Sequence, residues 1–444
     1  MNKGTRKWEK KQESREFEDR CWGFLKPFLE ELHGYVDRRL VKTLLDLVLV
    51  ILMHRHRNQG LILSELGDQM LGGERGPAGV KRIASLLHSM KWRGGLILKY
   101  LWRGANQKIQ ALVAEGEEAY VIWDESVLEK SESLKAEGLC AVRSMKAARL
   151  KRIKPGYFNP PGGRPIFVPG FNWLQILVTG SKGASVLAHL GWWSMRGEKA
   201  SSRREVEGKI LRKVTNLWGR KVIHLWDRGF AGSPWTTLAL DYHLRFILRW
   251  NKSYHLIGPD GRKQEVWKIS RGKHSWDYRL VWDARRRCYR KTGVIALPVQ
   301  LPEDPHPLFL VVSRPGYARK PWYLLTTEPI ENAQQAWKII FAYARRWQIE
   351  ISLRFTKSDM AFESPRLLDW ESRMKFLLIA ALAYAFLLSL LPNLDSIFLL
   401  ISHCCHRTGK WSREISAPLY RLRLALSRLW LAFRPHSLPS LSSG

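Results

Sequence analysis

The stretch from Tyr343 to Lys357 reads YARRWQIEISLRFTK and contains one acidic residue, Glu350, among several arginines and a lysine. It lies in a long helical pattern in which Tyr343, Arg346, Glu350 and Lys357 occupy positions i, i+3, i+7 and i+14. At about 3.6 residues per turn, this spacing puts an aromatic ring, a guanidinium, a carboxylate and an ammonium group on one helix face. From the stretch alone, Glu350 is either an ion-paired surface residue or part of a functional site. The rest of the chain decides between the two.

The composition favours a polyanionic partner. The chain has 444 residues, 45% of them hydrophobic, which allows two or three domains with sizeable cores and excludes wholesale disorder. The formal net charge is +33, with the excess of Lys and Arg spread over the whole length. Nucleic acid is the first candidate partner and a membrane surface the second. The 21 Trp residues supply apolar plates for cores or for stacking on bases.

Cysteine usage and apolar segments bear on the compartment. The five Cys residues show no paired spacing, which fits a reducing cytosol, and the charged N-terminus does not resemble a signal peptide. The segment 376–391 is mostly apolar but shorter than the roughly 20 residues that a membrane span needs. We therefore expect a helix buried in a large core, with a membrane anchor as the rival interpretation.

Residues 1–118 are expected to form a helical N-terminal domain that binds DNA ends. Within it, Leu61–Leu71 and Val80–Met90 are short helical runs separated by a Gly-rich turn, with Lys81, Arg82 and His88 at polar positions of the second run. Two such helices are either a DNA-reading pair or an ordinary helical hairpin.

An α/β domain is predicted to begin at Ala119. The run AYVIW is expected to be a buried strand that ends in Asp124, and KVIHLW a second strand followed at once by Asp227. Between them the pattern predicts a hairpin, 173–179 with 185–192, and a polar helix over 201–218. Residues 119–244 thus form the first part of a mixed α/β layer.

The remaining segments complete the predicted domain order. Residues 245–327 lose helical periodicity and are expected to form a β-rich insertion subdomain, and residues 328–391 the second part of the α/β domain, with the helix that carries Glu350. Residues 392–444 are expected to be a C-terminal helical region, including a basic amphipathic helix at Tyr420–Phe433 that could serve in dimerisation, and a disordered Pro/Ser tail.

Three acids stand out by position. Asp124 and Asp227 each follow a short apolar strand, and Glu350 lies on a helix. Carboxylates at the ends of adjacent strands can converge at one sheet edge, where a packed helix can present a third. Such a cluster needs protons or cations, and oxygen ligands favour Mg²⁺ or Mn²⁺; two ions about 4 Å apart would suit a phosphodiester displacement. Taken singly, each of these acids is better explained as a cap or turn residue.

Motifs now join these residues. The sequence WDES at 123–126, WDRGF at 226–230 and the spacing of Tyr343, Arg346, Glu350 and Lys357 together resemble the DDE transposases of bacterial insertion sequences that carry the Y-R-E-K signature. The resemblance runs from about residue 119 to residue 365 and includes the β-rich insertion between the second and third acids.

The resemblance implies an RNase H-like catalytic domain in which Asp124, Asp227 and Glu350 bind two catalytic Mg²⁺ ions, with Mn²⁺ as a substitute. It also implies that Tyr343, Arg346 and Lys357 contact phosphates near the scissile end. On this basis we interpret Arg346 and Lys357 as contacts for DNA more than as partners that neutralise Glu350. Trp322 is expected either to stack on a flipped base or to pack within the insertion.

The implied activity is DNA transposition. The protein is expected to bind terminal inverted repeats as a homodimer on double-stranded DNA, to cleave the ends, and to join the 3′-OH to target DNA in a cut-and-paste reaction with or without a hairpin intermediate. A cytoplasmic bacterial protein, nucleoid-associated when bound to DNA, follows from this interpretation. The alternatives are a catalytically inactive or domesticated DNA-binding relative and a membrane-associated basic protein.

Overall fold

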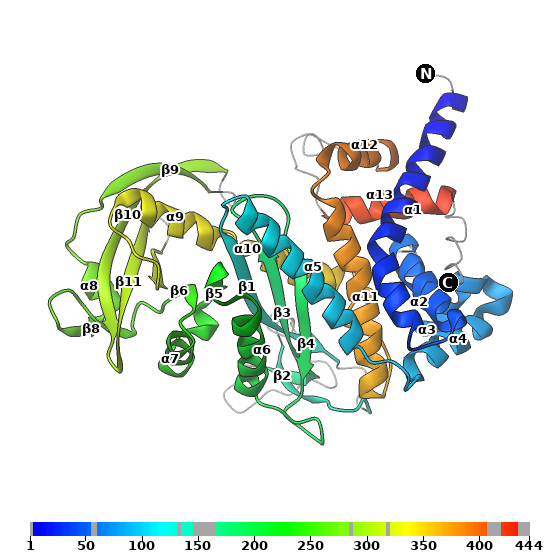
Figure 1. Ribbon diagram of the computed structural model, residues 1–444, viewed down its shortest axis with the longest axis horizontal. Helices are drawn as coiled ribbons and strands as arrows, with labels where there is room; N and C mark the ends of the chain where they lie inside the picture. The colour runs from blue at the N-terminus through cyan, green and yellow to red at the C-terminus, as the bar shows by residue number, and fades with distance from the viewer. Residues whose placement is uncertain are drawn as a thin grey trace.

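The computed structural model describes residues 3–54, 60–130, 135–144, 166–283, 287–316, 320–405 and 419–433. The Pro/Ser tail beyond residue 433, which the sequence predicts to be disordered, lies outside this described part. Figure 1 shows a helical half on one side of the molecule and a sheet, with its β-rich extension, on the other.

Five helices precede the sheet and follow the predicted helical N-terminal pattern: α1 (Lys3–His33), α2 (Arg38–Met53), α3 (Leu63–Leu71), α4 (Gly76–His88) and α5 (Gly95–Ala114). Helix α2 begins at Asp37, whose side chain accepts hydrogen bonds from the backbone N–H groups of Arg39 and Leu40. Helices α3 and α4 form a tight hairpin because Gly67 and Gly79 face each other where the two backbones cross.

The first part of the α/β domain contains β1 (Ala119–Glu129), β2 (Cys140–Arg143), β3 (Phe167–Thr179), β4 (Val186–Trp193), α6 (Arg203–Trp218), β5 (Val222–Trp226), α7 (Ser233–Asp241) and β6 (Arg245–Arg249). Strand β1 pairs antiparallel with β3 and parallel with β5, and β5 pairs parallel with β6. The predicted hairpin is confirmed as the antiparallel pair β3–β4. These strands form the mixed sheet, flanked by helices, that the RNase H-like prediction requires.

The β-rich region contains β7 (His255–Ile257), β8 (Lys263–Glu265), α8 (Val266–Ser270), β9 (Asp277–Asp283), β10 (Cys288–Leu301), β11 (Asp304–Pro315) and β12 (Trp322–Thr326). It continues the same sheet, because β12 pairs with both β6 and β11. The first and last strands of the predicted insertion, β6 and β12, therefore join the mixed sheet to the β-rich region within one continuous sheet.

The C-terminal half is helical, with α9 (Ala333–Ala344), α10 (Trp347–Ser358), α11 (Trp370–Leu390), α12 (Leu394–Cys404) and α13 (Leu419–Ala432). Within the described residues, α11 is long and apolar enough to cross a membrane, and 94% of its most apolar window is buried inside the protein. It lies between the N-terminal helices and the sheet (Figure 1). The expectation of a buried core helix agrees with this position.

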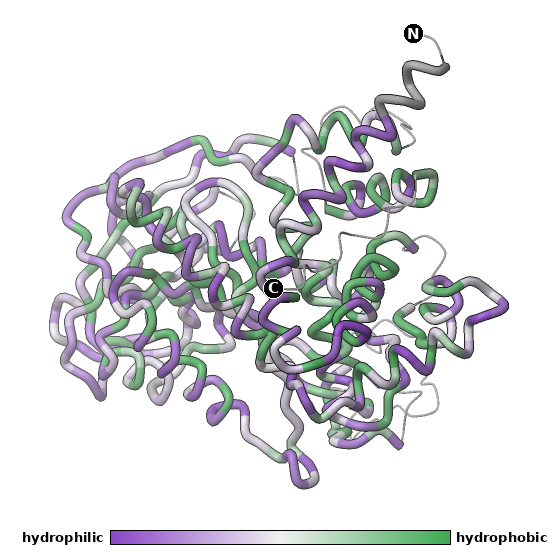
Figure 2. Tube along the Cα trace, turned by 45° about the vertical axis from the view of Figure 1, so that its right-hand side comes forward, coloured by the Kyte–Doolittle hydropathy of each residue, from purple (hydrophilic) through white to green (hydrophobic). Residues whose placement is uncertain are grey.

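Two hydrophobic clusters cover the two faces of the sheet. Tyr120 and Ile122 of β1 pack in the cluster that contains α10 and α11, whereas Val121 and Trp123 pack in the cluster that contains α5 and α6. This is the alternation expected of a strand covered on both faces. Figure 2 shows the corresponding mixture of hydrophobic and hydrophilic residues along the helices and strands.

Helix α13 packs against the N-terminal region. Arg423 donates to the carbonyl oxygen of Ile51 at 2.6 Å, near the end of α2, and Leu426 and Trp430 are fully buried. A cation that binds the last carbonyls of a helix stabilises its C-terminus. The apolar face of α13 is thus covered by this chain itself, and the role of the Tyr420–Phe433 segment in dimerisation stays a prediction.

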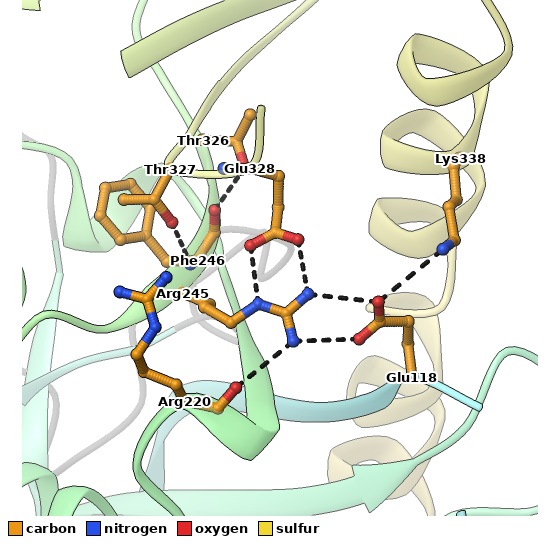
Figure 3. Close-up of polar contacts among 8 residues, drawn as sticks. All are labelled: Glu118, Arg220, Arg245, Phe246, Thr326, Thr327, Glu328 and Lys338. Atoms are coloured by element: carbon orange, nitrogen blue, oxygen red, sulfur yellow. Dashed lines mark hydrogen bonds and ion pairs between the residues drawn. The ribbon is translucent and has the colours of Figure 1, made fainter. Parts of the chain in front are cut away.

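A polar cluster around Arg245 links the ends of strands β1, β6 and β12 to helix α9 (Figure 3). Arg245 binds both carboxylate oxygens of Glu328, at 2.9 and 2.6 Å, and approaches Glu118 at 3.1 Å. Lys338 of α9 adds a second cation 3.7 Å from Glu118. Because Glu118 precedes β1, Arg245 begins β6 and Glu328 follows β12, this cluster fixes three strands and α9 at one end of the sheet.

Candidate active site

Asp124 lies where β1 loses its parallel neighbour. The sequence predicts that the strand ends at this residue, but β1 continues to Glu129 because β3 pairs with it as far as Gly170. The parallel strand β5 pairs with β1 only up to Ile122. Asp124 therefore sits within a strand, at the carboxyl end of its parallel pairing, where α/β sheets form crevices.

Asp227 follows β5 directly, as the sequence predicts. Its Oδ1 accepts a hydrogen bond from the backbone N–H of Gly229 at 2.7 Å and caps the short 3₁₀ turn Arg228–Phe230. Since β5 is the parallel neighbour of β1, Asp124 and Asp227 lie at the same end of this strand pair.

Glu350 lies in the first turn of α10, which packs against β1 and β3. The predicted continuous helix is wrong here, because α9 ends at Ala344 and α10 begins at Trp347. Arg345, in the intervening turn, donates to Thr179 Oγ1 at 2.9 Å and to the carbonyl of Gly180 at 3.1 Å. The turn lets two consecutive arginines bind different partners.

The other of these arginines bridges two of the acids. Arg346 donates to Asp124 Oδ2 at 3.3 Å and to Glu350 Oε1, and its side chain is only 8% exposed. Arg346 therefore does neutralise Glu350 in this structure, and its contact with DNA stays a prediction. The guanidinium offsets the mutual repulsion of carboxylates in a partly buried crevice.

The pKa of the Asp124 carboxyl shows that all three acids influence one another. Burial, together with the nearby Asp227 and Glu350 carboxylates, raises this pKa to about 7, although Arg346 opposes the rise. Within the described ranges, however, no three His, Cys, Asp or Glu side chains are close enough to hold a metal ion directly. The oxygens fit a hard cation chemically, but Asp124 and Glu350 first have to leave Arg346.

A buried hydrogen-bond network holds helix α10 at Ser352, two residues after Glu350. Gln175 is the strand partner of Asp124, and its amide donates to Ser352 Oγ at 2.6 Å. Tyr384 of α11 donates to the same oxygen at 2.6 Å. The network links β3, α10 and α11. It could not be predicted from the sequence, because its residues lie far apart along the chain.

A second polar group, also missed from the sequence, adjoins Asp124. Burial and the neighbouring Glu207 carboxyl raise the pKa of Glu125 to about 9, and Arg203 pairs with both acids. The only indication of this group in the sequence is that Glu125 directly follows Asp124. This position alone does not predict that Glu125 pairs with Arg203 beside Glu207.

An open cavity of about 750 Å³ begins at Glu350 and extends under the β-rich region. Its wall carries cations and aromatic rings, and the lining includes Arg249, Trp282, Arg290, Lys320, Trp322, Tyr343, Arg346, Trp347 and Glu350. Trp322 packs edge-on against Tyr343, with ring centroids 5.3 Å apart. The structure thus brings Trp322, Tyr343, Arg346 and Glu350 to one cavity.

Lys357 lies elsewhere on the same helix. It is in the last turn of α10, two turns after Glu350 and on the same helix face, but it is not among the residues that line the cavity. Its role in binding DNA stays a prediction.

Comparisons with known proteins supply independent information. Residues 199–386 match a protein family described as the transposase DDE domain, a range that includes Asp227 and Glu350 and begins after Asp124. Among solved structures, the chain is similar to a piggyBac transposase synaptic complex with hairpin DNA, with a TM-score of 0.42 and 14% sequence identity, covering 90% of this chain and 72% of that chain. Comparison with curated proteins gives no match.

Proposed function

We propose that this chain, whose residues 199–386 match the transposase DDE domain, is an insertion-sequence transposase that binds terminal inverted repeats, cleaves the element's ends and joins the 3′-OH to target DNA. The observation that carries the proposal is that Asp227 and Glu350 both lie near enough to Asp124 to raise the pKa of its carboxyl, and that Glu350 also lines a cavity with cations and aromatic rings. Whether excision passes through a hairpin is an outcome of the product analysis below.

We assign the three carboxylates to the binding of two Mg²⁺ ions, with Mn²⁺ as a substitute. Bound in this way, such ions would activate the attacking oxygen and stabilise the leaving oxygen of a phosphodiester. The chain's own contribution is to hold Asp124 on β1, Asp227 directly after the neighbouring strand β5, and Glu350 on the helix that packs against β1 and β3. Arg346 keeps the acids compatible until they bind cations.

The cavity is proposed to take the end of the DNA strand. Arg346 and Lys357 would contact phosphates, with Tyr343 supporting Arg346 from 5.9 Å. Trp322 is partly buried at the cavity wall. Its indole ring is the proposed stacking surface for a base that has been flipped out of the duplex.

The N-terminal helices are proposed to bind the terminal repeat. A groove of about 770 Å³ between α2 and α4 is lined by five cations and one acid, namely Arg39, Lys42, Lys81, Arg82, Lys91 and Asp37. Asp37 is already engaged as the cap of α2. The groove therefore presents net positive charge suited to a phosphate backbone.

The proposal includes a homodimer on double-stranded DNA, because two element ends need two active sites. A cytoplasmic protein that is associated with the nucleoid when bound to DNA follows from the same reasoning.

A strand-cleavage assay on a plasmid that carries the element's own inverted repeats tests the function. Wild-type protein should nick at the repeat ends only when Mg²⁺ or Mn²⁺ is present, and Glu350→Gln should abolish cleavage while retaining binding to the repeat. Product ends resolve the hairpin question. Equal cleavage by Glu350→Gln would refute the assignment of the acids, and absent cleavage by the wild type would favour an inactive DNA-binding relative.

A second measurement tests the groove. Exchanging Lys81 and Arg82 for Gln should weaken repeat binding about tenfold or more and lower its salt dependence. The same pair of exchanges at Lys252 and Arg262, two exposed cations of the β-rich region outside the groove and the cavity, is the control and should have a smaller effect. Equal losses in both variants would mean that the groove has no specific role.

A further inference from the structure

Arg203 makes contacts that the proposed function does not use. It is the first residue of α6, directly after the capping residue Ser202. Its Nε lies 2.8 Å from Glu207 Oε1 and also forms an ion pair with Glu125 Oε1. Its Nη2 donates to the carbonyl oxygen of Gly229 at 3.1 Å. One side chain therefore joins β1, α6 and the turn that follows β5.

Two of these contacts lie close in sequence to a proposed metal-binding carboxylate: Glu125 follows Asp124 directly, and Gly229 is two residues after Asp227. The backbone N–H of Glu125 donates to Asp124 Oδ1 at 2.9 Å, and the backbone N–H of Gly229 donates to Asp227 Oδ1 at 2.7 Å. Glu125 and Gly229 are thus each held on one side by an active-site carboxylate and on the other side by Arg203.

Arg203 is also well placed to act rigidly. Its guanidinium lies 5.1 Å from the ring of Phe230, which is buried, and its partner Glu207 is fully buried. A planar guanidinium with several donors can hold three partners in fixed directions, which a flexible ammonium group cannot do. The position of α6 therefore constrains the spacing between β1 and the turn after β5.

We propose that Arg203 is a positioning residue that sets the separation of Asp124 and Asp227 for cation binding. The proposal rests on the proposed function, because it concerns the same three-carboxylate site. Side chains that orient metal ligands from behind change metal affinity by roughly 10–100-fold when removed.

The neighbouring Arg204 provides a matched control. Arg204 also pairs with Glu207, through Oε2 at 3.1 Å, and its guanidinium lies over the ring of Trp235. Within the described part of the chain, Arg204 forms no hydrogen bond or ion pair with Glu125 or Gly229. Exchanging either arginine removes one positive charge and one ion pair to Glu207, but only the exchange of Arg203 releases the two segments that carry the acids.

The test measures Mn²⁺ binding by the full-length protein without DNA, using the electron paramagnetic resonance signal of free Mn²⁺. We expect Arg203→Gln to weaken Mn²⁺ binding about tenfold or more and Arg204→Gln to change it less than about twofold. Arg203→Lys should give an intermediate loss, because lysine retains the charge but not the planar set of donors. Circular dichroism establishes that each variant is folded, and repeat binding in EDTA should be unchanged.

The outcomes separate this inference from the proposed function. Wild-type protein that binds no Mn²⁺ would overturn the proposed function itself. Wild-type binding that is retained in folded Arg203→Gln, or lost equally in Arg204→Gln, would overturn the positioning role alone. Should Arg203→Gln fail to fold, Arg203→Lys decides: wild-type affinity in that variant would refute the need for a guanidinium.

Discussion

Asp124 is expected to destabilise the metal-free protein at neutral and alkaline pH. Burial, with Asp227 nearby, raises its pKa from 3.8 to about 7. One pKa unit corresponds to about 1.4 kcal/mol, so the ionised carboxylate costs on the order of 4 kcal/mol in the folded state. Asp124→Asn removes this charge but leaves Arg346 with one partner fewer, and we therefore expect a net gain of roughly 2–3 kcal/mol at pH 8.

The sign follows from proton linkage. Between the unfolded pKa of 3.8 and the folded pKa of about 7, the folded state holds a proton that the unfolded state has released. The free energy of unfolding of the wild type therefore falls as pH rises through this window and is level above it. The Asn variant lacks this titration, so the two proteins should differ little near pH 4 and most at pH 8.

Urea unfolding in EDTA, at about pH 4, 6 and 8, measures the difference. The large positive charge of the chain is common to both proteins and cancels in the comparison. Asp277→Asn is a control of opposite sign, because the backbone N–H of Tyr278 and the side chain of Arg279 lower the pKa of that carboxyl. A difference between Asp124→Asn and the wild type that is the same at pH 4 and pH 8 would refute the reasoning.

Three further stability predictions follow from individual contacts and can be checked by urea unfolding. Arg245→Met should lower the free energy of unfolding by roughly 2–3 kcal/mol, because two partly buried carboxylates lose their partner. Arg103→Met breaks a more exposed pair and should cost less than about 1 kcal/mol; equal losses in the two variants would contradict this reasoning. Gly79→Ala should lower the free energy of unfolding by about 1–3 kcal/mol, because a Cβ there collides with the backbone of α3. Gly104→Ala has open space around it and should stabilise α5 by about 0.5–1 kcal/mol. No loss of stability in Gly79→Ala would show that α3 and α4 separate easily. Tyr384→Phe should cost about 1 kcal/mol through loss of the buried hydrogen bond to Ser352, and no loss would mean that Gln175 alone satisfies the serine.

The parts of the fold that are local in sequence could be predicted from it. The apolar run before Asp124, the hairpin of β3 and β4 and the strand before Asp227 all follow from periodicity and turn residues. The extent of β1 could not be predicted, because its second half is held by pairing with β3, more than forty residues away along the chain. Similarly, β6 and β12 join the catalytic sheet through pairing across the whole β-rich region.

The candidate site shows the same division. The three acids were identifiable from motif and position, whereas their supporting side chains were not. Arg346 reaches Asp124 across 222 residues of sequence, and Gln175 reaches Ser352 across 177. The break between α9 and α10 was also hidden, because Arg345 and Arg346 fit a helical pattern and leave it only through tertiary hydrogen bonds.

The position of Arg346 explains how one residue can serve both as a partner of the acids and as a DNA contact. In the metal-free protein, its guanidinium is the nearest positive charge to Asp124 and Glu350, and without it these carboxylates would repel one another in a crevice of low dielectric. Two divalent cations bring more positive charge than three carboxylates offset, so with cations bound the attraction that holds Arg346 to the acids weakens. The guanidinium also lines the cavity that we assign to DNA, where a phosphate would then be its strongest available partner. Under the proposed function, a single arginine at the N-terminus of α10 would thus couple cation binding by the acids to binding of the DNA strand.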